Sequence, residues 1–437
     1  MRFLLRGGRV VDPASGRDEV ADVFVADGVV SSVAAEIEPD DAEIVDVGGA
    51  VVAPGLVDMH CHVREPGRED EENVASASAA AAAGGFTAIC AMPNTDPVAD
   101  SAAVTEKVWA VGRRTGLVDV VCAGALSKGL EGRKMADYGE MIHSAAHVRL
   151  FTDDGRGVQD ALLARRAMEY LSGFDAIYAE HCEDEALAND GQMNEGERSA
   201  ALGLRGIPTA AEEIMAARDL ALARLTGCRL HLLHVSTAGT VDLVRRAKSD
   251  GVAVTAEATP HHFTLTDEAL CDYDPNAKVN PPLRGEDDRA AVVAGIVDGT
   301  IDAIATDHAP HAPEEKDQEL TFAPPGMIGL ETALALTLTE LVEAGHLSLS
   351  DAVARLSLAP AQILGLERHG GPIAPGSPAN LCVFDPNAEW AVDPAALHSR
   401  SRNTPFAGRT LRGRVLHTFL EGRPVVRDAV VAEGAAA

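Results

Sequence analysis

Apolar, β-rich runs alternate with helical patterns through the middle of the chain. Eight such runs occur, at Gly55–His62, Phe86–Met92, Asp119–Ala125, His147–Thr152, Asp175–His181, Arg229–Val235, Val252–Glu257 and Ile301–Thr306. Between them, apolar residues recur at helical spacing over residues 101–115, 158–171 and 209–225, and Thr209 and Glu212 have the spacing of a capping box. Strands that alternate with helices in this way predict an α/β fold, a parallel (β/α)8 TIM-type barrel.

The two ends of the chain differ from the middle because both carry short β patterns. Near the start, Asp27-Gly28 separates two apolar segments, and near the end Glu421-Gly422 does the same, which is a hairpin signal. The predicted strands of these ends are Asp22–Ala26, Val29–Ala34, Asn380–Phe384, Arg414–Leu420 and Pro424–Val426. We expect a small β domain of residues 1–53 plus 365–437, and a barrel domain of residues 54–364.

Composition narrows the class of partner. The 437 residues include 37 Lys and Arg against 67 Asp and Glu, a formal net charge of −30. This acidity repels phosphate backbones and anionic lipid, so we expect no nucleic acid and no membrane as partner. A small anionic substrate is still compatible with this net charge. At contact distance, the attraction of a metal ion or an arginine exceeds the repulsion from the distant acidic residues.

The seven cysteines form no CxxC pair and are odd in number, which predicts a reduced, cytoplasmic protein. The apolar run at the N-terminus is too short for a signal peptide. The uncharged stretch from Asn73 to Thr95 is mostly alanine and is interrupted by Gly84-Gly85. It fits a buried helix and strand better than a membrane span.

Polar residues collect where the predicted barrel strands end. These residues are His60, His62, Asp153, Asp154, Glu180, His181, His234 and Asp307. All parallel strands of a barrel open onto one face at their carboxyl ends, so side chains 250 residues apart in sequence should meet at one rim.

His60 and His62 lie two apart on a strand and therefore point to the same side, where they can chelate one ion. Each feature alone has an ordinary structural explanation, but their shared position at strand ends indicates an open catalytic metal site. Imidazole and carboxylate ligands suit zinc, manganese or cobalt. The same alternation turns Cys61 away from the histidines; we expect Cys61 and Cys182 in the core, and His308 facing away from the site.

Two sequence motifs, taken together, are highly specific for one protein family. They are Asp58-x-His-x-His-x-Arg-Glu-Pro66, and Ala305-Thr-Asp-His-Ala-Pro-His311 followed by Lys316. Supporting segments are Met92–Thr95, Phe151–Gly155, Glu180–Glu183 and Asn280–Arg284. Through these segments the chain resembles, nearly end to end, the bacterial dihydroorotase family of the amidohydrolase superfamily.

The resemblance implies a site for one or two Zn²⁺ ions. His60, His62 and Asp307 would hold the first ion and His181 and His234 the second. Asp154, the second aspartate of its pair, would bridge them. Many relatives bridge their metals with a carboxylated lysine, but this chain has no lysine between Lys134 and Lys248. That absence favours the branch that uses aspartate.

The resemblance also implies the substrate and its ligands. The reaction would be the reversible cyclisation of N-carbamoyl-L-aspartate to L-dihydroorotate in de novo pyrimidine (UMP) biosynthesis, with Asp307 as general acid and base. The substrate-binding residues would be Arg64, Asn94, Asn280, His311 and the main chain of Pro325 and Gly326. Pro325 replaces a bulkier, often aromatic residue, and residues 310–327 would form a lid. A homo-oligomer, and association with aspartate transcarbamoylase, are further expectations.

Two alternatives stay open. The first is a hydantoinase or allantoinase, against which Arg64 and Asn280 favour a carboxylated ring. The second is an inactive homologue that scaffolds aspartate transcarbamoylase. Such a scaffold need bind no metal, whereas all six ligand positions are present in this chain.

Overall fold

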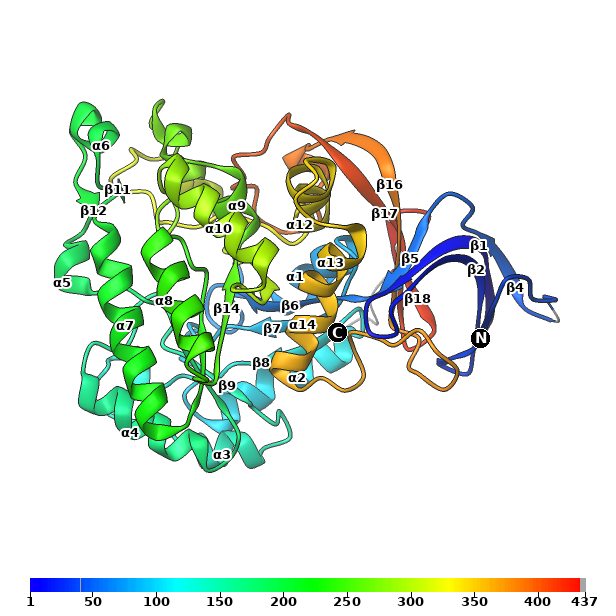
Figure 1. The fold of residues 1–437 in the computed structure, drawn as a ribbon, viewed down its shortest axis with the longest axis horizontal. Helices are drawn as coiled ribbons and strands as arrows, with labels where there is room; N and C mark the ends of the chain where they lie inside the picture. Colours follow the sequence, from blue (N-terminus) through cyan, green and yellow to red (C-terminus); the bar gives the residue numbers. More distant parts are fainter. Residues whose placement is uncertain (40, 433–437) are drawn as a thin grey trace.

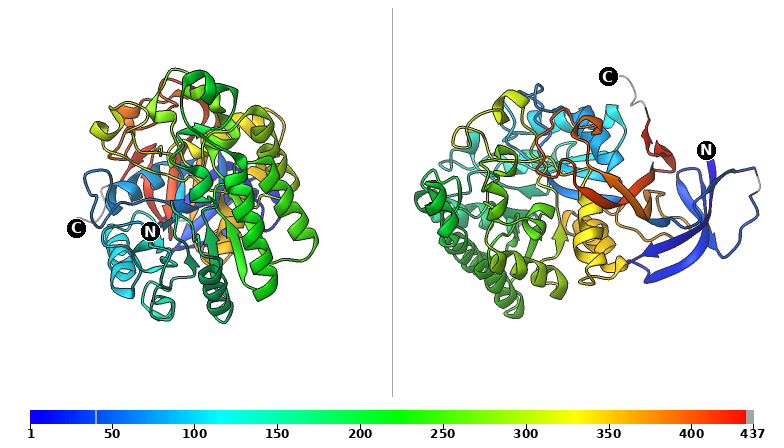
Figure 2. Two further views of the ribbon diagram at one scale, coloured as in Figure 1. Left: turned by 90° about the vertical axis from the view of Figure 1, so that its left-hand side faces the viewer. Right: turned by 90° about the horizontal axis from the view of Figure 1, so that it is seen from above.

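The structure, a computed structural model, describes residues 1–39 and 41–432. It has two parts, a barrel surrounded by helices and a β-sheet at one end of the molecule (Figure 1). The sheet combines the first strands of the chain with the last ones, which lie side by side in all three ribbon views (Figures 1 and 2).

The barrel contains the eight predicted strands, in shorter form. They are β6 (Leu56–Cys61), β7 (Phe86–Ala91), β8 (Asp119–Cys122), β9 (Leu150–Phe151), β10 (Ile177–Glu180), β13 (Arg229–Leu232), β14 (Val254–Ala258) and β15 (Ala303–Ile304). They pair in parallel as two arcs, β6-β7-β8 and β9-β10-β13-β14-β15. Parallel bridges between Gly124 and Phe151, and between Cys61 and His308, join the arcs at both seams. The predicted (β/α)8 class is confirmed.

Helices cover the outside of the barrel. The longer ones are α1 (Val74–Ala83), α2 (Ala102–Thr115), α4 (Ala161–Ser172), α7 (Thr209–Thr226), α8 (Ala238–Ser249) and α10 (Glu286–Asp298). The shorter ones are α3 (Tyr138–His143), α12 (Ala333–Thr337), α13 (Leu349–Val353) and α14 (Ala359–Leu364). Every residue of β6 and β7 is buried, because helices cover one side of the strands and packed side chains fill the other.

The predicted capping box at the start of α7 is wrong. Pro208 occupies the N-cap position and no side chain caps the helix. Glu212 is instead buried and accepts hydrogen bonds from Ser236 and from the main-chain N–H of Thr237 (3.1 Å). The carboxylate therefore ties α7 to the loop after β13, a long-range partner that the local spacing does not reveal.

The loops after β10, β14 and β15 contain additional short elements. They contain α5 (Glu185–Ala188), β11 (Met193–Asn194), α6 (Glu197–Leu202), β12 (Gly206–Ile207), α9 (Pro260–Thr264) and α11 (Pro313–Lys316). Three short 3-10 helices lie in these and a neighbouring loop, at Lys128–Leu130, Asp267–Leu270 and Pro275–Ala277. Nowhere in residues 1–39 and 41–432 does a helix have the length and apolar character needed to cross a membrane.

The nine-stranded sheet has the order β19-β18-β17-β16-β5-β1-β2-β3, with β4 paired to β1. The strands from the start of the chain are β1 (Arg2–Asp12), β2 (Arg17–Ala26), β3 (Val29–Ala34), β4 (Glu43–Asp46) and β5 (Val51–Pro54). Those from the end are β16 (Leu381–Ala391), β17 (Thr410–Leu420), β18 (Arg423–Arg427) and β19 (Val430–Val431). The predicted hairpin is present: β2 and β3 are antiparallel, and Asp27 and Gly28 have φ of 52° and 85°.

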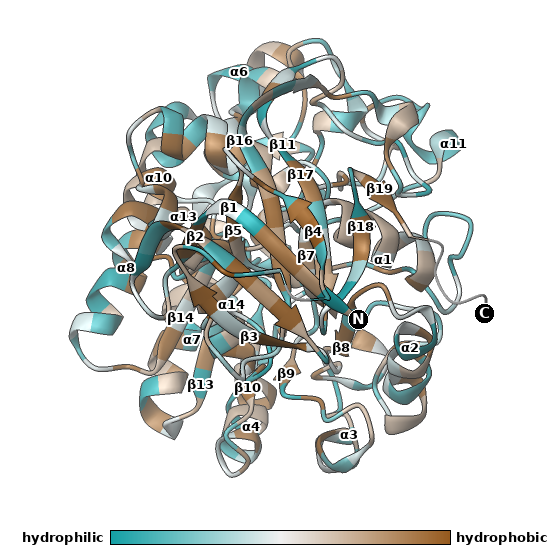
Figure 3. Cartoon of the chain, turned by 90° about the vertical axis from the view of Figure 1, so that its right-hand side faces the viewer, coloured by the Kyte–Doolittle hydropathy of each residue, from teal (hydrophilic) through white to brown (hydrophobic). Residues whose placement is uncertain are grey.

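The sheet has its own core, which includes Leu5, Val23 and Phe419, and it also packs on the barrel through Cys382 and Phe384. Seen from this end, the central strands are largely hydrophobic, with hydrophilic residues on the surrounding helices and loops (Figure 3). The domain limits at residues 53 and 365 stay a prediction, because part of the sheet shares the core of the barrel.

Candidate metal centre and substrate pocket

The structure brings the six predicted metal ligands together at the carboxyl ends of the barrel strands. His60 lies on β6 and the other five, His62, Asp154, His181, His234 and Asp307, follow the ends of β6, β9, β10, β13 and β15. All six are buried. The two positive φ angles among them, 30° at His234 and 45° at Asp307, show where the chain leaves the regular strand geometry.

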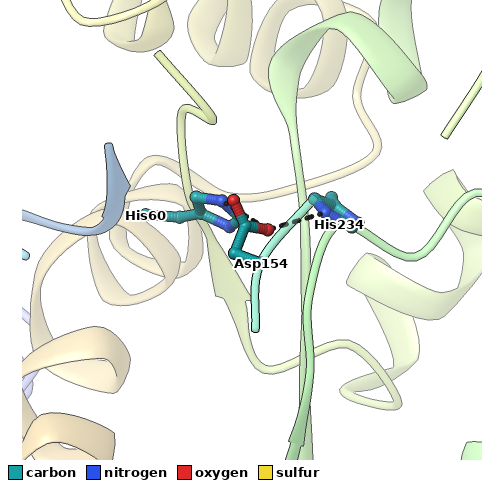
Figure 4. Close-up of side chains that lie close together, drawn as sticks. All are labelled: His60, Asp154 and His234. Atoms are coloured by element: carbon teal, nitrogen blue, oxygen red, sulfur yellow. Dashed lines mark ion pairs between the residues drawn. The ribbon is translucent and has the colours of Figure 1, made fainter. Parts of the chain in front are cut away.

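Asp154 lies at the middle of this cluster. Its Oδ1 is 3.4 Å from His60 Nε2, 3.6 Å from His234 Nε2 and 3.8 Å from His181 Nδ1. Its Oδ2 is 3.4 Å from His62 Nε2. Figure 4 shows the carboxylate of Asp154 between the rings of His60 and His234. One carboxylate thus faces all four imidazoles, the arrangement that a bridging ligand needs.

Asp307 closes the other side of the cluster. Its Oδ1 is 3.1 Å from His62 Nε2 and 3.5 Å from His60 Nε2. The ring nitrogens His181 Nδ1 and His234 Nε2 are 2.9 Å apart. Two overlapping groups therefore have their ligand atoms within 4.8 Å of one another: His60, Asp154 and His234, and His60, His62 and Asp307.

The carboxylates of the cluster are held in the charged form. Burial opposes the charge of Asp154 and Asp307, but the neighbouring imidazoles, His60 foremost, outweigh it and lower the pKa of both carboxyls. Burial and the adjacent His234 lower the pKa of His181 to about 3, which keeps that imidazole neutral, as a metal ligand must be.

Two atoms of the cluster are orphaned. His60 Nε2 and Asp154 Oδ1 are buried, and within the part of the chain that the structure describes neither has a hydrogen-bond partner. Buried polar atoms are ordinarily paired, so an unpaired nitrogen and an unpaired carboxylate oxygen that face each other fit a bound ion. A donor set of imidazole nitrogen and carboxylate oxygen suits zinc.

Outer groups orient the rings. Glu257 Oε1 lies 2.7 Å from His60 Nδ1, and its Oε2 lies 3.1 Å from His231 Nε2. Asn94 Oδ1 lies 2.8 Å from His62 Nδ1. With Nδ1 donating outward, each ring presents the lone pair of Nε2 to the centre. Sequence reasoning missed the roles of Glu257 and His231, although Glu257 ends the seventh predicted strand and carries the same signal as the ligands.

Asp58 on β6 connects this strand to the residues that follow β15. It accepts hydrogen bonds from Thr306 N (2.8 Å) and Thr306 Oγ1 (2.6 Å), which lie across the seam between β6 and β15. His308 points away from the ligands, as predicted, and lies 3.3 Å from Glu72. Cys61 and Cys182 are buried, and all seven cysteines are free.

A cavity of about 180 Å³ opens onto the centre. It is lined by all six residues predicted to bind substrate: Arg64, Asn94, Asn280, His311, Pro325 and Gly326. His62, Asp154, His181, His234 and Asp307 line it as well. Its volume is below that of pockets for drug-sized ligands, so it fits a small, single-ring molecule.

Glu71, which the sequence did not reveal, holds two of the pocket residues. Its Oε2 lies 3.1 Å from Arg64 Nε, and its Oε1 lies 3.0 Å from His311 Nδ1. Asn280 donates from Nδ2 to Glu183 Oε1 (3.3 Å), while its buried Oδ1 has no partner among the described residues. The pocket is therefore lined by a guanidinium and by an amide whose oxygen has no partner among the described residues.

The barrel, its attached β-sheet and the buried cluster of imidazoles and carboxylates define an enzyme of the amidohydrolase class. A family model described as "Dihydro-orotase-like" matches residues 49–240, and one described as "Amidohydrolase family" matches residues 329–426. The chain is 49% identical to the dihydroorotase of Pelotomaculum thermopropionicum over 99% of this chain and 100% of that one. It is also 49% identical to that of Streptomyces coelicolor, over 98% and 99%. The chain belongs to the dihydroorotase family, which confirms the resemblance drawn from its motifs.

Solved structures with the same fold carry other names. The dihydropyrimidinase of Brevibacillus agri superposes with a TM-score of 0.87 at 23% identity, over 100% of this chain and 97% of that one. The L-hydantoinase of Arthrobacter aurescens also gives 0.87, at 26% identity, over 99% and 98%. These likenesses support the barrel with its attached β-sheet.

Proposed function

We propose that this chain catalyses the reversible conversion of N-carbamoyl-L-aspartate to L-dihydroorotate and water, in de novo pyrimidine biosynthesis. The carrying observation is the placement of Arg64 in the same cavity as the cluster of imidazoles and carboxylates. Near-full-length identity of 49% to proteins named dihydroorotase supports the same reaction.

We assign His60, His62 and Asp307 to one zinc ion, His181 and His234 to a second, and Asp154 to both. The unpaired atoms of His60 and Asp154 support this assignment. When bound, zinc supplies positive charge that polarises an amide carbonyl and acidifies water.

Asp307 moves the proton. In ring opening, one of its carboxylate oxygens takes the proton of the attacking water as the new C–O bond forms. The carboxyl then gives this proton to the ring nitrogen as the C–N bond breaks. The neighbouring His60 and His62 keep the carboxyl ionised and ready to accept a proton. Ring closure runs through the same steps in reverse.

The other pocket residues hold the substrate. The Arg64 guanidinium binds the substrate carboxylate through charge-assisted hydrogen bonds, and His311 lies beside it, with its Nε2 3.5 Å from Arg64. Because Asn94 Oδ1 faces His62, its amide NH2 is left for a substrate oxygen. The free Oδ1 of Asn280 accepts from a substrate N–H. The main chain of Pro325 and Gly326 completes the pocket wall.

The setting of the reaction is also proposed. We place it in the cytoplasm, which the free and mostly buried cysteines support. We further propose a homo-oligomer and, as a separate partner, aspartate transcarbamoylase. Light scattering of the purified chain, alone and with the transcarbamoylase, tests both associations.

Asp307→Asn in the zinc-loaded enzyme tests the mechanism. We expect kcat to fall by at least about 100-fold, because the amide cannot accept the proton. Asp302→Asn, at the residue before β15 and paired with Lys248 (2.6 Å), is the matched control and should keep kcat. Near wild-type turnover of Asp307→Asn at full zinc content would reject the proton-transfer role.

Hydantoin hydrolysis is the second candidate, because solved structures of this fold include hydantoinases. A spectrophotometric assay of dihydroorotate against hydantoin separates the two, since Arg64 favours only the carboxylated ring. A purified chain without bound metal and without either activity would point to the scaffold alternative.

A further inference from the structure

The loop from residue 310 to residue 327 forms one wall of the pocket. It contains α11 and contributes His311, Pro325 and Gly326 to the cavity lining. Its outer part is exposed, with Phe322 at 72% relative exposure, so apolar packing does not hold all of the loop. Its main-chain carbonyls must find partners within the protein or in water.

Lys278 lies in the neighbouring segment and binds this loop. Its Nζ donates to Leu320 O (2.8 Å), Ala323 O (2.6 Å) and Gln192 Oε1 (2.6 Å). The three hydrogen bonds use every proton of the ammonium group. The main-chain oxygen of Lys278 also accepts from Gly326 N (2.8 Å), so one residue fixes the loop at three points.

Lys316 makes the reciprocal connection. It is the last residue of α11, and its Nζ donates to Pro275 O (2.9 Å) in the segment of Lys278 and to Pro324 O (2.7 Å) in its own loop. Pro324 directly precedes the two residues whose main chain faces the substrate. Residues 275–280 and the 310–327 loop therefore each contribute one lysine that donates to main-chain carbonyls of the other segment.

These ammonium groups are buried without an ion pair. Lys278 and Lys316 are 7% and 6% exposed, and among the described residues neither has a carboxylate within 4.0 Å. Burial lowers the pKa of Lys278 to about 8, and burial together with Lys278 lowers that of Lys316 to about 7. Burying two unpaired cations costs folding free energy. The contacts that these two cations make are hydrogen bonds that hold the loop.

We propose that Lys278 and Lys316 are positioning residues that clasp the 310–327 loop against residues 275–280 and thereby fix the main chain of Pro325 and Gly326 for substrate binding. The proposal rests on the proposed function, because it assigns the loop a role in holding dihydroorotate. Neither lysine lines the cavity beside the cluster of imidazoles and carboxylates, so both act through the loop.

Lys278→Met and Lys316→Met test the clasp in the zinc-loaded enzyme. A lost charge-assisted hydrogen bond to a carbonyl corresponds to about a tenfold change, so we expect the KM for dihydroorotate to rise about tenfold. We expect kcat and zinc content to change much less. Lys248→Met is the matched control, since Lys248 also donates to a carbonyl, Gly299 O (3.1 Å), at a distance from the loop. Its KM should equal that of the wild type.

Limited proteolysis reports on the loop without substrate. A glutamyl endopeptidase can cut after Glu314, Glu315 and Glu319, and we expect faster cleavage there in both clasp variants but not in Lys248→Met. Lys278→Arg and Lys316→Arg should recover part of the KM, because a guanidinium also donates to two carbonyls.

Two outcomes would overturn the clasp. One is a wild-type KM together with wild-type loop cleavage in both Met variants. The other is cleavage that rises throughout the chain, because the lysines would then support the fold in general. A wild-type enzyme that fails to convert dihydroorotate would refute the proposed function, whereas the cleavage comparison would still decide whether the lysines hold the loop.

Discussion

The candidate ligands His60 and His62 each have one ring nitrogen engaged by a partner outside the centre. Glu257 accepts a hydrogen bond from the Nδ1–H of His60, and Asn94 Oδ1 accepts one from the Nδ1–H of His62. A neutral imidazole has a single N–H, so these partners decide which nitrogen carries the lone pair. Glu257 and Asn94, which lie outside the centre, therefore determine that both rings direct the lone pair of Nε2 toward the centre.

Arg64→Ala tests recognition of the substrate carboxylate. We expect KM to rise about 10- to 100-fold with a smaller change in kcat, because charge-assisted hydrogen bonds are lost. The carboxylate of Glu71 keeps a cationic partner in this variant, because Arg68 lies 2.9 Å from it. The variant should therefore fold. Arg156→Ala, an exposed arginine next to the Asp154 loop, is the control in steady-state kinetics. An unchanged KM in Arg64→Ala would remove Arg64 from the substrate site.

The sequence identified the residues that face the centre better than those that support them. His60, His62 and Asp307 stand out because motif and strand end coincide. Glu71 reaches His311 and Lys278 reaches Leu320, both far away in the chain, and no local pattern marks such contacts. Glu212 is the opposite case, in which a local pattern predicts a contact that is absent. Its spacing from Thr209 fits a helix cap, but its carboxylate accepts hydrogen bonds from Ser236 and Thr237.

At the scale of elements, all eight barrel strands could be predicted, but not their lengths. β9 and β15 contain two residues each, whereas the apolar runs predicted six. Apolar runs report burial, and Val148 and Ile301 are buried although neither belongs to a paired strand. Near Asp154 and Asp307 the chain turns inward toward the centre, and the regular pairing ends there.

His262 on α9 gives the fold a dependence on pH. Its Nε2 lies 3.0 Å from Pro281 O and its Nδ1 lies 2.8 Å from Thr259 Oγ1, and burial lowers its pKa to about 4. The unfolded chain takes up a proton near pH 6.5, before the folded one does, so stability falls as the pH drops from about 6.5 toward 4.

Urea unfolding at pH 7 and pH 5 measures this dependence. Between these values the wild type should lose about 2 kcal/mol more than His262→Gln, which cannot take up that proton. His346→Gln, at an exposed histidine, should behave as the wild type. Equal losses in the wild type and His262→Gln would show that His262 is not the responsible group.

At the scale of the whole molecule, the barrel consists of two hydrogen-bonded arcs that meet at two narrow seams. His60 and His62 belong to the arc of β6, whereas Asp154, His181, His234 and Asp307 follow strands of the other arc. Candidate ligands from both arcs surround one centre. A bound cation therefore adds attraction across the seam between β6 and β15, where Asp58 and Thr306 already join the arcs.

Metal removal should accordingly destabilise the chain. We expect a chelator to lower Tm by about 5 °C or more, because a ligand at 1,000 times its Kd contributes about 4 kcal/mol. Calorimetry before and after chelation measures the shift, and added zinc should restore it. The same Tm with and without metal would contradict a site that spans both arcs.

The pairing of β5 links the ends of the chain in time as well as in space. β5 pairs on one side with β1 and on the other with β16, which leaves the ribosome more than 300 residues later. While the barrel is being translated, one edge of β5 has no neighbour, and unpaired edges invite association between nascent chains. The final strands to be synthesised are thus the ones that shield this edge, and premature termination before residue 381 would release a polypeptide with the edge uncovered.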